Sequence, residues 1–238
     1  MGIFGSYGWS GEALDLLENK LLDGGFSFGF DPIKVKFSPS TLMVNTIIET
    51  GTYFGRTLLK EKRRQLNRTG GGLNVSKSDP AILALGRIVG SLCILTACKG
   101  SESNKLTGAM VASWVSQASF SPLGLSIAVA KDRAVENLLH KEDNFALNIL
   151  SVKKHQNILK QFLQSFTPGE NRFSGLNLEK SPKGQPILPE ALAWLEGCVR
   201  QRMECGDHWL IYAEINHGKV LDPNGMTAVH HRRTGANY

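Results

Sequence analysis

The chain has 238 residues, of which 42% are hydrophobic, and carries 27 Lys and Arg against 21 Asp and Glu, a formal charge of +6. This length and apolar content predict one large or two small folded domains, and the interleaved acids disfavour a nucleic-acid-binding arm. No apolar run approaches the roughly 18 residues of a membrane-spanning helix, and no signal peptide opens the chain, so we expect a cytoplasmic protein. The four cysteines lack zinc-site spacing, so no metal site is expected.

Residues 1–66 have the pattern of a small α/β unit. A short strand and a Gly/Ser/aromatic loop precede a helix that Ser10 is expected to cap and that Gly24 and Gly25 are expected to end. A strand at 30–37, with alternating apolar and Lys residues, and a second helix follow. Two strands are too few for a doubly wound domain, so the pattern predicts an incomplete α/β segment.

The composition of the sequence changes after residue 66. Residues 67–80 are rich in Gly, Ser, Asn and charge and lack apolar periodicity, which predicts a linker. From 81 to 238, many short β-rich runs predict a mainly β domain, a closed barrel of six or seven strands with peripheral helices at 132–142 and 153–163. The last two long strands are expected to join at 206–207.

Residues 107–139 contain the main candidate site, as two expected strands joined at 121–122 and followed by a helix. One interpretation is ordinary barrel core. The other is that the hydroxyl and amide side chains of the first strand, if buried, require hydrogen-bond partners that a planar heteroaromatic ligand supplies. Lys131 and Arg133 lie where the second strand gives way to the helix, so two cations and free backbone N–H groups would converge on a phosphate. The second interpretation predicts a phosphorylated planar cofactor.

Four motifs carry a resemblance to a known family. They are TGAMVASWVSQASFSPLGLSIAVAKDRAVENLL at 107–139, FALNIL at 145–150, GDH at 206–208 and HHRRTGANY at 230–238. In this order they resemble the flavin reductase-like, FMN-binding split-barrel family, over residues 81–238. The resemblance implies a split β-barrel, a bound flavin and a homodimer that shares the flavin sites. It implies ring contacts from Ala112, Ser113, Trp114, Ser116, Gln117, Ala118 and Ser119, and phosphate contacts from Lys131, Asp132 and Arg133.

Three further candidates come from the last two motifs, and each has a structural alternative. His208 either caps a strand turn or faces the nicotinamide. His230 and Arg232 either belong to a solvated tail or approach the flavin or the pyridine nucleotide phosphates, where Arg offers paired donors. Trp114 likewise fills the core or stacks on a ring.

The N-terminal segment resembles part of a second domain. GIFGSYGWSGEA at 2–13 is similar to the ring-contacting loop of the flavodoxin-like domain in flavodiiron proteins, and FDPIKVKF at 30–37 to the strand that follows it. Flavodiiron proteins of oxygenic phototrophs carry a C-terminal flavin reductase domain. Residues 1–66 are therefore expected to be a flavodoxin-like remnant that does not itself bind FMN. The six histidines do not form a diiron ligand set, so oxygen reduction is not expected of this chain.

The resemblance implies an NAD(P)H-dependent flavin oxidoreductase module that transfers hydride to FMN, with FAD possible, and that feeds a diiron centre in the full-length family. The cofactor supplies the chemistry and the protein supplies orientation and charge. Two alternatives stay open. One is a non-catalytic flavin- or haem-binding split-barrel module, and the other is a fragment without an independent role.

Overall fold

The computed structural model describes residues 1–68, 79–101, 105–164, 166 and 168–235, and for 63–68 only the backbone. The chain divides into two compact units, called here the N-terminal unit and the barrel unit. The N-terminal unit comprises 1–72, 102–104 and 167–170, and the barrel unit comprises 73–101, 105–166 and 171–238. The boundary falls within the predicted linker at 67–80, most of which lies outside the described residues.

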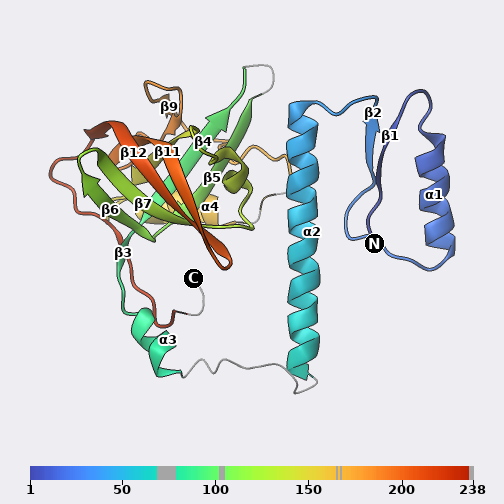
Figure 1. Ribbon diagram of the computed structural model, residues 1–238, viewed down its shortest axis with the longest axis horizontal. Coiled ribbons are helices and arrows are strands. Elements are labelled where there is room, and N and C mark those ends of the chain that lie inside the picture. The colour runs from blue at the N-terminus through green and yellow to red at the C-terminus, as the bar shows by residue number, and fades with distance from the viewer. Residues whose placement is uncertain (69–78, 102–104, 165, 167, 236–238) are drawn as a thin grey trace. The chain divides into compact units, whose positions relative to one another are not determined.

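The N-terminal unit has two short parallel strands between two helices (Figure 1). Strand β1 (Phe4–Tyr7) pairs with β2 (Ile33–Lys36) over four residues each. Helix α1 (Glu12–Asp23) follows β1, and the longer helix α2 (Thr41–Arg68) follows β2. This is the predicted β-α-β-α order, because a parallel pair needs a crossover and the apolar periodicity after β1 supplies a helix.

The start of α1 differs from the prediction that Ser10 caps it. The N-cap residue is Gly11, with φ 73°, and no side chain caps the helix. Gly11 takes a left-handed conformation that a residue with a Cβ rarely adopts, so the chain turns into the helix one residue after Ser10. The predicted end is confirmed, since the Gly24 N–H donates to the Lys20 carbonyl at 3.0 Å.

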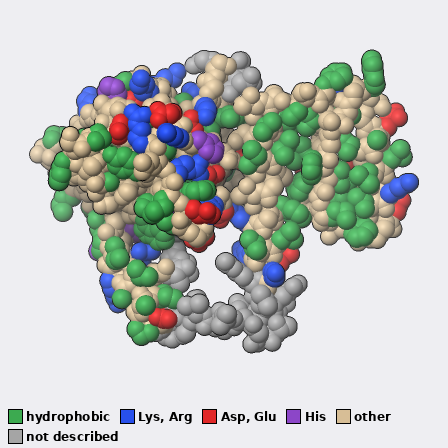
Figure 2. Space-filling model, viewed as in Figure 1, with side chains coloured by type: hydrophobic (Ala, Val, Ile, Leu, Met, Phe, Trp, Pro, Cys, Tyr) green, Lys and Arg blue, Asp and Glu red, His purple; other side chains and the backbone are tan. Residues whose placement is uncertain are grey.

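Few apolar side chains of the N-terminal unit are buried. Ile3 and Val35 are buried, whereas α1 contains no buried residue at all. Figure 2 shows hydrophobic side chains across the visible face of this unit. The exposed large hydrophobic residues of this unit are Met1, Phe4, Trp9, Leu16, Leu17, Leu22, Phe26, Phe37, Leu42, Val44, Ile48, Tyr53, Leu58 and Leu59. Parallel strands are normally covered on both faces, so two strands leave much apolar surface in water.

The barrel unit is built on a seven-stranded antiparallel sheet with the order β5-β4-β8-β11-β12-β7-β6. Its strands are β4 (Cys93–Lys99), β5 (Leu106–Ala112), β6 (Val115–Phe120), β7 (Leu123–Ala130), β8 (Asn144–Ile149), β11 (Ala193–Cys205) and β12 (His208–Val220). The sheet curls (Figure 1), so one face of almost every strand meets in a common core that includes Ile127, Phe145 and Val199. The predicted turn at 206–207 joins β11 to β12.

Two predicted helices have different outcomes. The helix expected at 153–163 is α4 (His155–Leu163), which buries Ile158 and Phe162. The helix expected at 132–142 is wrong in kind, since only a five-residue 3-10 helix, η2 (Ala134–Leu138), forms there. Its buried Val135 and Leu138 pack into the barrel core, and these two residues three apart lie on one face of a 3-10 turn.

The strand expected before 121–122 is also corrected. Instead of one strand there are two, β5 and β6, separated at Ser113 and Trp114. Strand β5 pairs with β4, whereas β6 forms a hairpin with β7 at the opposite end of the sheet order. The break lets one continuous apolar sequence serve both ends of a curled sheet.

The C-terminal segment returns to the residues that precede β4. Strand β13 (Val229–His230) pairs with β3 (Gly90–Ser91), and the Gly235 N–H donates to the carbonyl of Ile82 in helix α3 (Pro80–Leu85) at 2.7 Å. A separate hairpin is formed by β9 (Glu179–Lys180) and β10 (Pro186–Ile187). This C-terminal segment, residues 229–235, is called here the tail. It lies against α3 and β3 and close to the break between β5 and β6.

Candidate functional site

Five of the predicted site residues come together at the break between β5 and β6. The rings of Trp114 and His208 have centroids 4.9 Å apart, with an interplanar angle of 36°. The Arg232 guanidinium lies over the Trp114 ring, with Cζ 5.0 Å from its centroid. Beside them, Ser113 Oγ and His230 Nδ1 are 3.3 Å apart. Three distant stretches of sequence thus form one cluster, called here the Trp114 cluster.

Two glycines allow the backbones to approach this cluster closely. A Cβ placed on Gly90 would lie 1.7 Å from the Ser113 carbonyl oxygen, and one on Gly86 would lie 2.5 Å from the Thr234 nitrogen. Neither position tolerates a larger residue without a backbone shift, because the atoms in the way are backbone atoms. These glycines hold β3 against Ser113 and α3 against the tail. Sequence reasoning singled out neither, because nothing in the local pattern distinguishes them.

His208 has one ring nitrogen without a partner. Its Nδ1 lies 2.7 Å from the Asp207 carboxylate, and its Nε2 is buried with no hydrogen-bond partner among the described residues. When Nδ1 carries the proton donated to the carboxylate, Nε2 is a free acceptor. A buried acceptor without a partner costs about 1–3 kcal/mol. Its position beside the half-buried Trp114 ring fits a planar ligand with a hydrogen-bond donor at its edge.

His230 is kept neutral at the same site. Burial, together with the nearby positive charge of Arg232, lowers the pKa of His230 below its ordinary value. A neutral imidazole can donate or accept towards Ser113, whose side chain is buried. The Arg232 side chain is fixed separately, because its Nη2 donates to the Leu85 carbonyl at 3.4 Å.

The polar run on β6 differs from the expectation of a buried polar wall. Ser116, Gln117 and Ala118 are exposed, and because successive side chains of a strand point to opposite faces, both faces of the edge strand β6 meet water here. Exposed hydroxyl and amide groups need no ligand, so the requirement for hydrogen-bond partners holds only for Ser113, which is 2% exposed. Ala112 is buried in the barrel core. The ring contacts implied for these residues therefore stay predictions.

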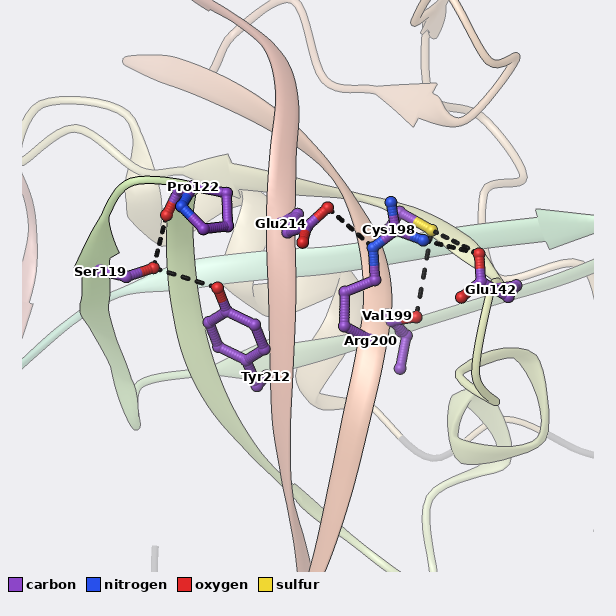
Figure 3. Close-up of polar contacts among 8 residues, drawn as sticks. All are labelled: Ser119, Pro122, Glu142, Cys198, Val199, Arg200, Tyr212 and Glu214. Atoms are coloured by element: carbon purple, nitrogen blue, oxygen red, sulfur yellow. Dashed lines mark hydrogen bonds and ion pairs between the residues drawn. The ribbon is translucent and has the colours of Figure 1, made fainter.

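Ser119 serves the hairpin itself. Its Oγ donates to the Pro122 carbonyl at 2.6 Å and lies 3.1 Å from the Tyr212 hydroxyl (Figure 3). Gly124 gives these groups room, since a Cβ there would lie 2.5 Å from Ser119 Oγ. The hydroxyl thus ties the β6–β7 turn to β12, and its hydrogen bonds are satisfied within the chain.

The structure shows the ion pairs and backbone hydrogen bonds of the predicted phosphate site at 131–133. The Lys131 ammonium forms an ion pair with Glu204, and Arg133 Nε lies 3.8 Å from the Asp132 carboxylate. The expectation of free backbone donors is wrong for the two cationic residues. The Lys131 N–H donates to the Asp207 carbonyl and the Arg133 N–H to the Ala130 carbonyl, each at 3.0 Å. Phosphate binding by these side chains stays a prediction.

Ion pairs that the sequence did not reveal clamp the segment around η2 onto β11. Arg200 donates from Nη1 to Glu142 at 2.6 Å and from Nε to Glu214 at 2.8 Å (Figure 3). Two residues further on, Arg202 pairs with Glu136 and donates to His140 Nδ1 at 2.7 Å. Except for Glu214, which is 14 residues away on β12, the partners are 58 to 66 residues away, so only the alternation of Arg along β11 hints at them. This clamp fixes the loop that follows Lys131.

Among the described residues, no group of three His, Cys, Asp or Glu side chains is placed to hold a metal ion. None of the helices in the described parts of the chain could span a bilayer. The Trp114 cluster combines an aromatic ring, a buried His208 Nε2 without a partner among the described residues, and the guanidinium of Arg232.

Comparisons with known proteins identify the family of the barrel unit. The family model described as the flavin reductase like domain matches residues 85–237, so the barrel is the split barrel of that family and the chain belongs to it. All of the chain is 53% identical to a diflavin flavoprotein A 3 of Synechocystis and 44% identical to diflavin flavoprotein A 1 of the same organism. The chain spans 38% and 39% of the length of these two relatives.

The fold is also found in solved structures. The NADH:FAD oxidoreductase SgcE6 of Streptomyces globisporus superposes with a TM-score of 0.55 at 23% identity, covering 65% of this chain and 87% of that one. A second structure of the same enzyme, in complex with NAD and FAD fragments, has a TM-score of 0.53 at 21% identity, covering 62% and 84% of the two chains.

Proposed function

We propose that this chain is an NAD(P)H-dependent flavin oxidoreductase module whose reaction takes place at the Trp114 cluster. The observation that carries the proposal is the buried Nε2 of His208, which has no partner among the described residues and lies beside the Trp114 ring. The family match and the NADH:FAD oxidoreductase with the same fold support the reaction class. A bound flavin would supply the hydride acceptor, and a reduced nicotinamide nucleotide would be the donor.

The side chains of the cluster have distinct tasks in this proposal. Trp114 forms an aromatic wall of the site, and Arg232 from the tail lies over its ring. His208 accepts a hydrogen bond at Nε2, with its tautomer fixed by Asp207. Ser113 and the neutral His230 hydrogen-bond to each other at the edge of the cluster, which leaves one of the two with a donor for a ring carbonyl. No side chain is required as a nucleophile.

The finer assignments are part of the same proposal. The flavin is FMN, with its phosphate at Lys131 and Arg133, as the resemblance implies. The module is cytoplasmic and forms a homodimer through its barrel. In a longer protein such as the diflavin relatives, residues 1–66 complete a flavodoxin-like domain and the barrel passes electrons to it. Chromatography of the released flavin tests the assignment of FMN, and the molar mass in solution tests the homodimer.

Rapid mixing of the flavin-loaded protein with NADH or NADPH tests the function. We expect the flavin absorbance near 450 nm to bleach, at a rate that depends on nucleotide concentration. The flavin of the variant His208→Ala is expected to bleach at least about tenfold more slowly. The variant loses one hydrogen bond, and a loss of about 1.4 kcal/mol in transition-state stabilisation lowers the rate tenfold. His217→Ala is the matched control, since His217 is an exposed histidine on the same strand.

Two results would count against the proposal. Stable flavin binding without bleaching by either nucleotide would identify a non-catalytic binding module instead. Equal rates for the His208 and His217 variants would place the reaction away from the Trp114 cluster.

A further inference from the structure

The stretches of chain around the Trp114 cluster contain almost no acidic residues. Residues 80–101, 105–131 and 223–235 include no Asp or Glu, although the whole chain has 21. The carboxylate that the structure places at the cluster belongs to Asp207, and it contacts His208. Positive charges here are therefore poorly compensated, and such a region attracts anions.

The cations near the cluster fall into two groups that differ in their partners. Lys131 and Arg133, which follow β7, lie next to the carboxylates of Glu204 and Asp132. Arg87 follows α3, and Arg233 belongs to the tail. Both are exposed, and neither forms an ion pair with any described residue. The second group therefore has its full charge and its hydrogen-bond donors available to a ligand.

Arg87 and Arg233 lie on two backbone segments that approach each other closely, the end of α3 and the tail. Their sequence neighbours Gly86 and Thr234 are in backbone contact, since a Cβ on Gly86 would lie 2.5 Å from the Thr234 nitrogen. Arg232, the other neighbour of Arg233, lies over the Trp114 ring. The pair thus sits on the segment that carries the proposed ring site.

We propose that Arg87 and Arg233 bind the 2′-phosphate of NADPH and make this phosphorylated nucleotide the preferred hydride donor. This inference rests on the proposed function and names its substrate. A phosphate monoester carries close to two negative charges at neutral pH, and guanidinium groups bind its oxygens in pairs. NADH has a neutral hydroxyl at the same position, so the two exposed arginines add little to its binding free energy.

The double variant Arg87→Ala/Arg233→Ala tests the proposal in the flavin-loaded chain. We expect the concentration of NADPH needed for half-maximal bleaching to rise about tenfold or more, and that for NADH to change less than about twofold. Lys219→Ala is the control, because it removes an exposed positive charge from the far end of β12. Equal weakening of both nucleotides, or no change for either, would overturn the proposal.

A binding measurement decides the point without hydride transfer. In calorimetry, we expect adenosine 2′,5′-bisphosphate to bind the wild-type chain about tenfold more tightly than adenosine 5′-monophosphate, and the double variant to bind both equally. Equal affinities in the wild-type chain would refute the 2′-phosphate site. If neither nucleotide bleaches the flavin but this preference is found, the proposed reaction fails and the phosphate site stands.

Discussion

The two units of this chain use a similar supply of apolar residues very differently. In the barrel unit, Phe145, Ile127 and Val199 are fully buried in a core shared by nearly all strands. In the N-terminal unit, α1 buries nothing, and Trp9 is 92% exposed. Figure 2 shows the same contrast, with charged side chains on the barrel unit and hydrophobic ones over the N-terminal unit.

The difference comes from topology more than from composition. A curled seven-stranded sheet gives each strand neighbours on its inner face, whereas two parallel strands with two helices enclose very little. Since hydrophobic stabilisation follows the apolar area removed from water, the barrel should carry most of the free energy of folding. It also carries every residue of the Trp114 cluster. Stability and candidate function thus reside in the same unit.

The largest expected effect is a matched pair of phenylalanine substitutions. Phe145→Ala should lower the free energy of unfolding of the barrel by about 3–5 kcal/mol, because it leaves a cavity at a fully buried position. Phe4→Ala, at a 71% exposed position of the N-terminal unit, should change it by less than about 0.5 kcal/mol. Chemical denaturation followed by tryptophan fluorescence measures both, and similar losses would contradict the contrast.

A pair of glycine substitutions sharpens the comparison at the site. Gly90→Ala should destabilise the barrel by about 1–3 kcal/mol and weaken flavin binding, because the new Cβ meets the Ser113 carbonyl. Gly51→Ala in α2 should stabilise its helix by up to about 1 kcal/mol, since no atom lies within 4 Å of the new Cβ. Flavin titration and denaturation of both variants test this, and unchanged flavin affinity in the first would remove Gly90 from the site.

The cysteine thiols report on the barrel unit at alkaline pH, because all four cysteines lie outside the N-terminal unit. Burial raises the pKa of Cys93 from 9.0 to about 12. The folded state therefore favours the protonated thiol. Its contribution is fully present below pH 9 and is lost as the pH rises from about 9 towards 12, by about 1.4 kcal/mol per pH unit.

Cys93→Ala removes this dependence, whereas Cys205→Ala, at an exposed cysteine, should retain it. Between pH 8 and pH 10.5, the free energy of unfolding should therefore fall less steeply for Cys93→Ala than for Cys205→Ala. The loss should differ by about 1–2 kcal/mol at pH 10.5. Parallel pH profiles for the two variants would show that the Cys93 thiol does not titrate in this way.

The smallest expected effect is that of removing the N-terminal unit. A chain that lacks residues 1–72 should bleach its flavin at a rate within about twofold of the whole chain, because every residue of the Trp114 cluster belongs to the barrel unit. It should also be more soluble, since the exposed apolar residues are gone. Single-turnover bleaching compares the two chains, and a large loss of rate would show that the units act together.

Much of the barrel could be predicted because its signals are local. The turn at 206–207 and helix α4 each follow from neighbouring residues, and both are confirmed. The 3-10 helix and the break at Ser113 were missed, since apolar periodicity does not show where a curled sheet must change partners. The exposure of Ser116 and Gln117 was missed for the same reason. An edge strand and a central strand can have identical sequences.

The sequence by itself determined the family, the order of its motifs and the residue types available to bind a flavin and a nucleotide. The tertiary structure decided which of them meet. It paired Lys131 with Glu204, 73 residues away, and left Arg87 and Arg233 without an acidic partner among the described residues. It also set Trp114 against His208 and Arg232. Such pairings depend on sheet register and on backbone contacts at Gly86 and Gly90, which join residues that are distant in the chain.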